Sequence, residues 1–598
     1  MSNVEDVKKN SHQLRGTLPE SLASGSPQFS DDEKHLIKFH GIYQQDDRDE
    51  RIERQKAKQD AAWILMVRSK IPGGGLSAEQ YLALDRLADE FGNGTLRITT
   101  RQDFQFHGIL KSDVKQLIRK INDAQVTTFG GCGDVERNVM ATPAPFDTPA
   151  HREVQRVARE LSHELLPKTN AYFEVWLNGE KVKINPTDRS DQKNLSDQPD
   201  PLYGETYLPR KFKTTIVLPP ENDVDIYAHD LGFVAHAPKG EIEGYTVLAG
   251  GGFGMDHGKQ ATYPFLAVPL FYIQKQHMLA TAKAVIAVHR DHGDRTNRKH
   301  ARIKYLIAER GVDWFRNEVK ARLEAPTEEP KPFVLKSVAD MLGWHEQGDA
   351  ERRLFCGIRV ECGRVADYDA SAPGKLKGVR YRSGLRAIIE RFKCPVRLTA
   401  NQNIICYNLS AQDRSAFDAM LKEHRIADAE SYTHAHRMSI ACVALPTCGQ
   451  ALSESERIFP ALMDEFDVIL KELHIEREEI LFRMTGCPNG CARPYNADIA
   501  FVGRGIDKYA VYIGGSLRGD RMAGLMFKTV DLNEIPARIR PFLEEYVKGR
   551  LNGESFSDYW GRTHTNGPAP HPSQFHEELT AREARRTQTG TKNMGPIG

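Results

Sequence analysis

The sequence lacks the features that mark a secreted or membrane-spanning chain. Its first residues, MSNVEDVKKN, contain no apolar segment of the kind found in a signal peptide, and no run of 18 apolar residues occurs along the 598 residues. Nine cysteines are an odd number for a disulfide framework, which favours thiols that are reduced or bound to metal. We therefore expect a cytoplasmic protein.

Several common cofactor motifs are also missing. No Walker loop and no His-Glu-x-x-His sequence occurs, and the glycine run Gly250–Gly254 lacks the third glycine of a dinucleotide-binding fingerprint. An excess of one charge is absent too, because 82 Lys+Arg against 81 Asp+Glu leave a net charge of +1, so any basic site must be a local concentration. A redox centre in this chain would receive its electrons from a separate protein.

An internal duplication organises the chain, which is too long for one hydrophobic core and is expected to form three or four domains. The segment Arg97–Asp103 (RITTRQD) aligns without a gap with Arg397–Asn403 (RLTANQN), and Arg137-Asn-Val-Met falls opposite Arg437-Met-Ser-Ile at the same offset of 300 residues. Two related α/β halves facing each other about a pseudo-twofold axis would form a cleft that suits a large cofactor.

Local composition predicts one well-defined helix and two poorly packed ends. Ser77, followed three residues later by Gln80, predicts a capping box for a helix over 78–91 that ends at Gly92. Residues 1–60 are polar and end in an almost entirely charged stretch, which is typical of a solvated arm with little core. The tail from residue 564 is rich in Pro, His, Thr and Gly and is predicted to be disordered.

Four cysteines form two close pairs on turns rich in glycine and proline. Cys442 and Cys448 are separated by five residues, and Cys487 and Cys491 by three. Thiolates are the soft ligands that select zinc or iron–sulfur clusters. The five-residue gap fits structural zinc sites poorly, whereas a 4Fe-4S cluster tolerates more varied spacing. The spacing favours a cluster and leaves zinc and unrelated core cysteines as alternatives.

The remaining cysteines are interpreted differently. Cys356 and Cys362 lie on the buried face of one predicted alternating strand, and Cys394 and Cys406 belong to its neighbour. Core packing is the better explanation for these four thiols. Cys132 is a lone loop thiol to which we assign no role.

Basic residues recur on the strands and turns that would face the cleft. Arg97 and Arg101 are four positions apart on one strand and share a face, as do Lys211 and Lys213, and Asn401 replaces Arg101 in the second copy. One such cation is more often a solvated surface charge, but several around one cleft predict a polyanionic ligand held by charge-assisted hydrogen bonds. The cations concerned are Arg68, Arg97, Arg101, Arg137, Lys211 and Lys213.

These motifs together resemble the sirohaem–4Fe-4S sulfite and nitrite reductases. The resemblance rests on the two cysteine pairs, on segments 97–108 and 208–213, and on Arg137-Asn-Val, and it extends over residues 14–560. Residues 38–48 (KFHGIYQQDDR) and the stretch LRGT at 14–17 resemble the NADPH-dependent assimilatory branch of that family, in which such an arm would dock a flavoprotein.

The resemblance implies an α+β and α/β fold with a pseudo-twofold duplicated sirohaem reductase architecture, made of two ferredoxin-like halves and two α/β cofactor-binding domains. The implied segments are an N-terminal docking arm (1–60), the first ferredoxin-like half (61–144), the first α/β domain (145–349), the second ferredoxin-like half (350–428), the second α/β domain with the cysteines (429–563) and the tail (564–598).

The resemblance also implies the members of the site. The metal ligands of the 4Fe-4S cluster would be Cys442, Cys448, Cys487 and Cys491, and Cys491 would also bridge to the sirohaem iron. The catalytic residues that surround sulfite would be Arg68, Arg137, Lys211 and Lys213. The sirohaem-binding region would contain Arg97, Arg101, His107, Gly250, Gly251 and Gly252.

The function implied by the resemblance is the six-electron reduction of sulfite to sulfide, with electrons from NADPH through a separate flavoprotein (alpha) subunit and with no nucleic-acid or membrane partner. One alternative is a ferredoxin-dependent sulfite or nitrite reductase with the same centres. A more distant alternative is a non-catalytic anion-binding protein with a structural four-thiolate zinc site.

Overall fold

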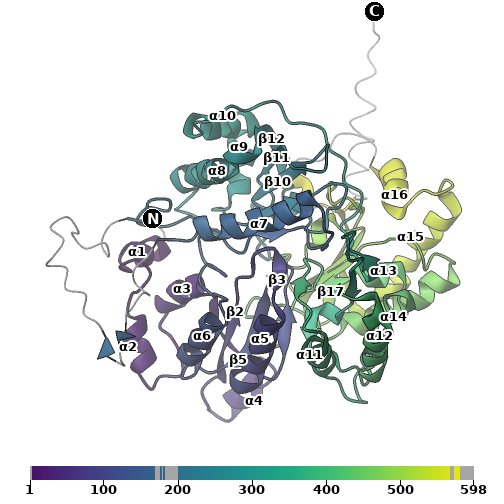
Figure 1. Cartoon of the computed structure of the whole chain (residues 1–598), viewed down its shortest axis with the longest axis horizontal. Helices are drawn as coiled ribbons and strands as arrows, with labels where there is room; N and C mark the ends of the chain where they lie inside the picture. Colours follow the sequence, from purple (N-terminus) through teal and green to yellow (C-terminus); the bar gives the residue numbers. More distant parts are fainter. Residues whose placement is uncertain (1–2, 169–175, 178–179, 182–198, 566–571, 580–598) are drawn as a thin grey trace, which may run out of the picture.

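The computed structural model describes residues 3–168, 176–177, 180–181, 199–565 and 572–579 (Figure 1). The strands of this part form four five-stranded sheets and one two-stranded sheet of β7 (Trp176–Leu177) and β8 (Glu180–Lys181). The four sheets form two pairs, and the members of each pair have equivalent strand orders in their own part of the chain. The predicted duplication is therefore visible in the topology. None of the helices in the described ranges has the length and apolar content that a membrane crossing requires.

The first pair consists of two antiparallel half sheets. The first half sheet runs β1 (Ile42–Asp46), β2 (Trp63–Arg68), β5 (Phe104–Ile109), β4 (Leu96–Ile98) and β15 (Arg364–Val365). The second half sheet runs β13 (Gly343–Glu346), β14 (Leu354–Ile358), β17 (Ile404–Leu409), β16 (Val396–Leu398) and β3 (Gly75–Leu76). Their helices are α5 (Ala78–Phe91) and α6 (Val114–Asp123) in the first copy, and α11 (Tyr381–Phe392) and α12 (Arg414–Glu423) in the second.

The helix predicted over 78–91 is confirmed as α5. Ser77 Oγ accepts a hydrogen bond from Gln80 N at 3.2 Å, and Gln80 Oε1 accepts one from Ser77 N at 3.0 Å, so the capping box is complete. Each bond satisfies a backbone donor that the first turn of a helix leaves without an internal partner.

The two half sheets exchange an edge strand. β15, from the second copy, pairs with β4 through Arg364 and Arg97, whereas β3, from the first copy, pairs with β16 through Gly75 and Arg397. Each half sheet is thus completed by the other copy. Separating the copies would expose unpaired backbone donors and acceptors on both edges.

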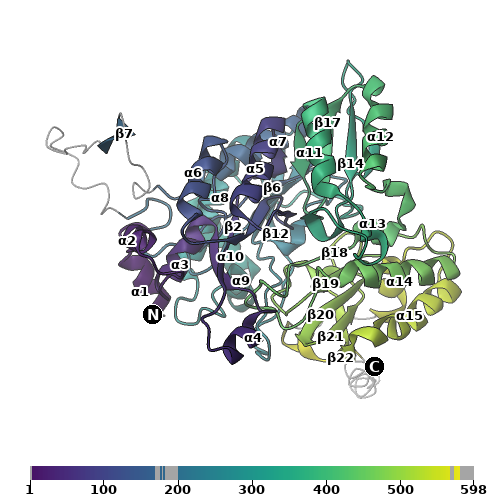
Figure 2. The same ribbon diagram turned by 90° about the horizontal axis from the view of Figure 1, so that it is seen from below.

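The second pair consists of two mixed sheets; Figure 2 labels β6 and β12 of the first and β18 to β22 of the second. The first mixed sheet runs β6 (Met140–Ala141), β9 (Thr214–Val217), β10 (Leu231–His236), β11 (Gly244–Ala249) and β12 (Val268–Gln274). The second mixed sheet runs β18 (Ile440–Ala441), β19 (Phe482–Thr485), β20 (Ile499–Gly505), β21 (Lys508–Ile513) and β22 (Gly524–Asp531). In both, the first three strands are parallel and the later pairings are antiparallel.

In each mixed sheet a long helix lies between the first two strands of the sheet and further helices follow its last strand, while the second copy has an additional short helix before its first strand. The helices of the first are α7 (Pro149–Glu164), α8 (Met278–His292), α9 (Ile303–Arg310) and α10 (Val312–Arg322). Those of the second are α13 (His434–Met438), α14 (Phe459–Glu472), α15 (Ile535–Gly549) and α16 (Phe556–His564). Their apolar faces supply much of the buried core, which runs continuously through the first copy into the second half sheet.

The same hydrogen bonds hold equivalent loops in both copies. Gln102 Nε2 donates to Ala141 O at 2.9 Å, and Gln402 Nε2 donates to Ala441 O at 2.8 Å. Both glutamines lie at positive φ, 55° and 69°. These bonds join each half sheet to its own mixed sheet.

The two copies meet at a buried ion-pair network. Asp225 Oδ2 accepts from Arg493 Nε at 2.8 Å and from Arg483 Nη1 at 2.9 Å, while Asn496 Nδ2 donates to Asp225 Oδ1 at 2.8 Å. Asp225 is fully buried. Removing the carboxylate would leave two buried guanidinium groups without their counter-ion.

The N-terminal arm is more tightly packed than its composition predicts. Its helices are α1 (Asn3–Lys9), α2 (Leu18–Ala23), α3 (Glu33–Leu36) and α4 (Arg51–Lys56). The expectation of a solvated arm with little core is wrong, because Leu14, Leu36 and Phe39 are buried and β1 pairs with β2 along its whole length. The apolar segment HLIKFHGIY provides the side chains that anchor it.

Two further expectations need correction. Residues 566–571 and 580–598 of the predicted disordered tail lie outside the described residues, but residues 572–579 are ordered, and Phe575 is buried against Tyr495 and Tyr512. The predicted strand through Cys362 is also too long. β14 ends at Ile358, and Cys362 lies in the turn η6 (Glu361–Gly363) at φ 51°, although it is buried as expected.

Candidate active site

The parallel strands β18 and β19 bring the two cysteine pairs together. Cys442 follows β18 directly, and Cys487 lies just beyond the end of β19. Because the carboxyl ends of neighbouring parallel strands meet at one edge of a sheet, the two pairs share that edge. Cys442 N donates to Met484 O at 3.2 Å, and Gly486 N donates to Cys442 Sγ at 3.2 Å.

All four cysteines line one cavity of about 580 Å³. Burial raises the pKa of Cys442 to about 12, and the charge of nearby Cys491 contributes; burial and Cys491 also raise the pKa values of Cys448 and Cys487. Thiols that are crowded and buried in this way ionise only if a positive centre compensates their charge. The donor set therefore fits a metal cluster held by four thiolates.

The four predicted catalytic cations line the same cavity. Lys211 and Lys213 precede β9, and within the described ranges neither ammonium group has a hydrogen-bonding or ion-pair partner. Burial lowers the pKa of both lysines well below the ordinary value, and Arg137 contributes for Lys211 while Lys211 contributes for Lys213. Two unpartnered cations at a cavity wall are poised to bind an anion or to release a proton.

Arg68 and Arg137 are held in place by neighbours on the cavity wall. Arg68 Nη1 lies 3.2 Å from Cys132 Sγ, and its Nε lies 3.8 Å from Asp103 Oδ1. Arg137 Nε donates to Gly133 O at 3.4 Å. Although burial lowers the pKa of both arginines, nearby acidic groups more than offset it, so both pKa values are raised and both guanidinium groups stay charged.

Arg97, Arg101 and His107 also line the cavity, but the two arginines already have protein partners. Arg97 Nε donates to Glu456 Oε2 at 2.6 Å, which joins the first half sheet to the second copy. Arg101 Nη1 lies 3.3 Å from His229 Nδ1. His107 is different, since it is buried and neither ring nitrogen has a partner within the described ranges. Such an orphaned ring fits a cavity that takes up a polar cofactor.

The glycines predicted for the cofactor region, Gly250, Gly251 and Gly252, are not among the residues lining the cavity. A Cβ on Gly251 would lie 2.3 Å from Tyr227 O, and one on Gly252 would lie 2.5 Å from Arg302 Nη2. Close packing within the first mixed sheet explains why these positions need glycine. Their contact with a macrocycle stays a prediction.

Sequence reasoning missed the part of the cavity wall formed by the N-terminal arm. Lys38 and Tyr43 line it, together with Arg210, Asp134 and Arg298. Burial, with Arg298 contributing, lowers the pKa of Lys38 to about 8. The low polarity of segment 35–45 within a polar arm was the available signal.

Four thiols and a row of cations in one cavity, between two copies of one fold, define a metal-centred redox protein that binds a small anion. Two domain families match the sequence. The nitrite/sulfite reductase ferredoxin-like half domain matches residues 57–124 and 345–424, and the nitrite and sulphite reductase 4Fe-4S domain matches residues 159–327. The second match covers strands β9 to β12 of the first mixed sheet and does not include the four cysteines of the cavity, which lie in the duplicate of that sheet.

Relatives align over nearly the whole chain. The sulfite reductase (NADPH) hemoprotein beta-component of Anoxybacillus flavithermus is 42% identical over 93% of this chain and 95% of its own, and that of Myxococcus xanthus is 42% identical over 96% and 98%. The solved structure of the Mycobacterium tuberculosis NirA protein shares the fold, with a TM-score of 0.74 at 22% identity over 94% of this chain and 96% of that one. The chain belongs to the nitrite and sulfite reductase family, and the predicted duplicated architecture is confirmed.

Proposed function

We propose that this chain is the hemoprotein component of an NADPH-dependent sulfite reductase, which reduces sulfite to sulfide with six electrons. The observation that carries the proposal is the single cavity lined by the four cysteines and by Arg68, Arg137, Lys211 and Lys213. The names of the full-length relatives support the same reaction and substrate. A basic wall suits a small dianion, and the thiol quartet suits the source of electrons.

The cofactors of this reaction are sirohaem and a 4Fe-4S cluster. When bound, these groups would supply single electrons and a metal centre for sulfite. The residues proposed to hold the cluster are Cys442, Cys448, Cys487 and Cys491, the last of which would also reach the sirohaem iron. The residues proposed for the macrocycle are Arg97, Arg101, His107 and Gly250–Gly252. The raised thiol pKa values and the unpartnered ring of His107 support these assignments.

Arg68 and Arg137 are proposed to bind and orient the sulfite oxygens. Their raised pKa values keep them charged throughout turnover, and a planar guanidinium can hold two oxygens of one anion at once. Fixed cations in a largely buried cavity also stabilise the negative charge that develops on oxygens as they leave sulfur.

Lys211 and Lys213 are proposed to supply protons. Every oxygen that leaves as water must take up protons, and an ammonium group whose pKa is lowered by burial releases its proton more readily. In the described part of the chain neither ammonium group has a hydrogen-bonding or ion-pair partner, which leaves both available to substrate.

Electrons are proposed to come from NADPH through a separate flavoprotein (alpha) subunit, docked by the N-terminal arm (1–60). Arg48 in this arm donates to Cys448 O at 3.3 Å and to Ala451 O at 2.6 Å. A partner bound to the arm would therefore lie beside the loop that carries Cys448. All nine cysteines are free thiols, which suits a reducing cytoplasmic location.

A visible spectrum and two electron donors test the proposal. The purified protein is expected to absorb as a sirohaem protein, to change its spectrum when sulfite is added, and to form sulfide faster with flavoprotein and NADPH than with reduced ferredoxin. A colourless protein after full reconstitution, the result expected of a zinc site, would overturn the proposal. A preference for ferredoxin or for nitrite would replace it with the ferredoxin-dependent alternative.

A further inference from the structure

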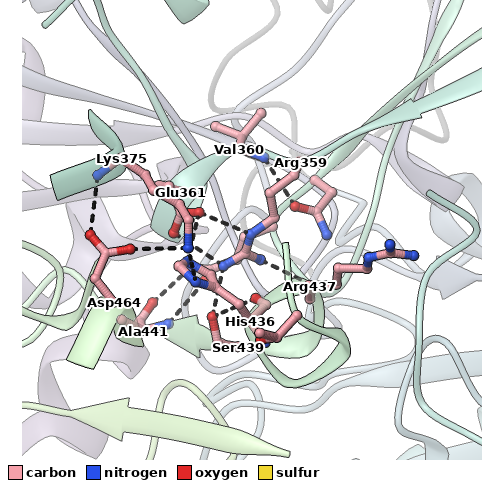
Figure 3. Close-up of polar contacts among 12 residues, drawn as sticks. Arg359, Val360, Glu361, Lys375, His436, Arg437, Ser439, Ala441 and Asp464 are labelled. Atoms are coloured by element: carbon pink, nitrogen blue, oxygen red, sulfur yellow. Dashed lines mark hydrogen bonds and ion pairs between the residues drawn. The ribbon is translucent and has the colours of Figure 1, made fainter. Parts of the chain in front are cut away.

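A second group of ionisable side chains, part of which Figure 3 shows, is largely buried and does not belong to the lining of the cavity. At its centre is His436, on the short helix α13. His436 Nδ1 lies 2.9 Å from Asp467 Oδ2 on α14, and His436 Nε2 lies 3.1 Å from Glu361 Oε1 on η6. All three side chains are buried. The mechanism proposed above uses none of them.

The carboxylates on both sides of the ring favour the charged form of His436. Each ring nitrogen lies beside a carboxylate oxygen, which can only accept a hydrogen bond, and the Lys375 ammonium lies 3.3 Å from Nδ1 on the same side as Asp467. Only the imidazolium form has two donors. Although burial lowers the pKa of His436, Glu361 and Asp467 raise it above the ordinary value. A neutral ring would turn a nitrogen lone pair toward one of the two carboxylates.

His436 is connected to the cysteine loop by a chain of hydrogen bonds. Glu361 pairs with Arg359, whose Nη2 donates to Ser439 Oγ at 2.8 Å and whose Nη1 donates to Arg437 O at 3.3 Å. Ser439 Oγ donates in turn to His436 O at 2.8 Å. This network encloses residues 436–439, which lead directly into β18 and, one residue beyond that strand, into Cys442.

The same group of side chains could be mistaken for a metal site. Ligand atoms of His436, Asp464 and Asp467 lie within 4.8 Å of one another. Lys375 already occupies the place of a cation, because its ammonium group pairs with Asp467 and lies 3.1 Å from Asp464 Oδ1. The cluster is therefore complete as a set of protein ion pairs.

In the described part of the first copy, the position equivalent to His436 carries a carboxylate and not a histidine. The residue 300 positions before His436 is Glu136, whose carboxylate accepts from Thr214 N at 3.1 Å and Thr214 Oγ at 2.8 Å. The following residue, Arg137, lines the cavity, whereas its counterpart Arg437 does not. This position thus distinguishes the copy that carries the cysteines.

We propose that His436 is a positioning residue for the 4Fe-4S cluster: by bridging Glu361 and Asp467 as a cation, it fixes the turn that leads into β18 and so holds Cys442 in its ligating position. This inference rests on the proposed function, which assigns Cys442 to the cluster. It predicts that loosening the bridge makes the cluster easier to lose without removing any ligand.

Release of iron from the holoprotein to a chelator is the direct test. His436→Gln keeps a polar side chain of similar reach but cannot be a cation, and we expect iron to be released about tenfold faster than from the unmodified protein at pH 6, the loss expected for a hydrogen bond to a buried charged group. Ser439→Ala removes one member of the hydrogen-bond chain but leaves the charge of His436, and it should give a smaller increase in the rate of iron release. His424→Gln, a change at a histidine whose Nδ1 contacts only Met420 O in the described part of the chain, is the matched control.

The pH profile separates this role from general destabilisation. The groups that face His436 are Glu361, Asp467, Lys375 and the ring of Tyr432. As pH rises through the raised pKa of His436, iron release from the unmodified protein should accelerate toward the rate of His436→Gln, whose own profile should stay flat. Electron paramagnetic resonance of the reduced cluster should also be broader in His436→Gln.

Equal release rates for the unmodified protein and for both His436→Gln and Ser439→Ala at pH 6 would overturn the inference. If His436→Gln does not fold, Ser439→Ala decides alone, and an unchanged rate counts against the inference. Failure of the unmodified protein to take up a cluster would instead overturn the proposed function, so the two outcomes are distinguishable.

Discussion

The two mixed sheets share one topology but present opposite strand ends to the cavity. In the first, Lys211 and Lys213 precede the amino end of β9, and Arg137 precedes β6. In the second, Cys442 and Cys487 follow the carboxyl ends of β18 and β19. Because β6 and β9 are parallel, as are β18 and β19, the residues at the same end of the two neighbouring strands lie at the same edge of the sheet. A duplicated fold can therefore supply cations from one copy and soft ligands from the other.

The comparison also shows which features the two copies share and which differ between them. The loop hydrogen bonds of Gln102 and Gln402 are the same in both copies, so the frame was kept. The chemistry changed at single positions within that frame, such as Arg101 and its counterpart Asn401. The two copies thus differ in chemistry at equivalent positions of one frame.

The largest expected effect comes from removing a thiol of the second copy. Cys442→Ser or Cys487→Ser should abolish cluster binding, with iron content and sulfite turnover falling to background, because three thiolates and a hydroxyl do not match the four-thiolate donor set. Iron analysis and the visible spectrum provide the measurement. Cys394→Ala, at a buried thiol outside the cavity, is the control and should keep its iron. Retention of a full cluster by both serine variants would contradict the ligand assignment.

Removing a cation of the first copy should affect turnover and not the cofactors. Lys211→Ala and Lys213→Ala are each expected to lower sulfite turnover by roughly a hundredfold or more, the usual size of a proton-transfer contribution, while the visible spectrum stays largely intact. Steady-state kinetics and absorption spectra of the same preparations check this. Lys508→Ala, on the second mixed sheet and outside the cavity, should match the unmodified protein. Unchanged turnover in both alanine variants would refute the proton-supply role.

The junction between the copies offers a test of stability. Asp225→Asn leaves Arg483 and Arg493 buried without their counter-ion, and we expect the free energy of unfolding to fall by about 3–5 kcal/mol. Denaturant unfolding of the two proteins, followed by circular dichroism, measures it. Asp531→Asn, at an exposed ion pair with Lys508, should leave the midpoint unchanged. Equal midpoints for Asp225→Asn and the unmodified protein would show that the junction does not hold the copies together.

The smallest effect concerns the arm that completes the first copy's side of the cavity. Lys38 is charged below its lowered pKa of about 8, so it should lose its attraction for sulfite as pH rises through that value. Over this pH range the KM for sulfite should increase by a factor roughly three times larger in the unmodified protein than in Lys38→Met, because Lys38→Met lacks the charge at every pH. Measuring KM from pH 6.5 to 9.5 for both proteins checks this. Parallel profiles would exclude Lys38 from the anion site.

Local features of the fold followed from the sequence because their causes are local. The capping box of Ser77 and Gln80 joins residues three positions apart, and the period of the duplication is visible in the residues themselves. The packing of the arm did not follow, because the buried positions of Leu36 and Phe39 depend on surfaces formed by distant segments. The strand exchange between the half sheets is equally invisible, since β3 and β15 are only two residues long.

The residues of the candidate site could be predicted from the sequence, but their arrangement in space could not. The six cations and four thiols were singled out by type and spacing, and all of them line the cavity. Their partners could not be inferred, because Arg97 meets Glu456 across 359 positions of the chain. For the glycine run Gly250–Gly252 the structure gives close contacts with other protein groups, such as Tyr227 O for Gly251 and the Arg302 side chain for Gly252, while its contact with a cofactor stays a prediction.

By itself the sequence determined the chemical groups, their spacing along the chain and the two-copy plan, because those properties are written in residue type and order. Only the tertiary structure decided that the amino ends of one mixed sheet and the carboxyl ends of the other open into the same cavity. It also decided that His436 would be enclosed between two carboxylates drawn from separate elements. Both outcomes depend on contacts between segments far apart in the chain, and such contacts leave no local pattern in the residues that make them.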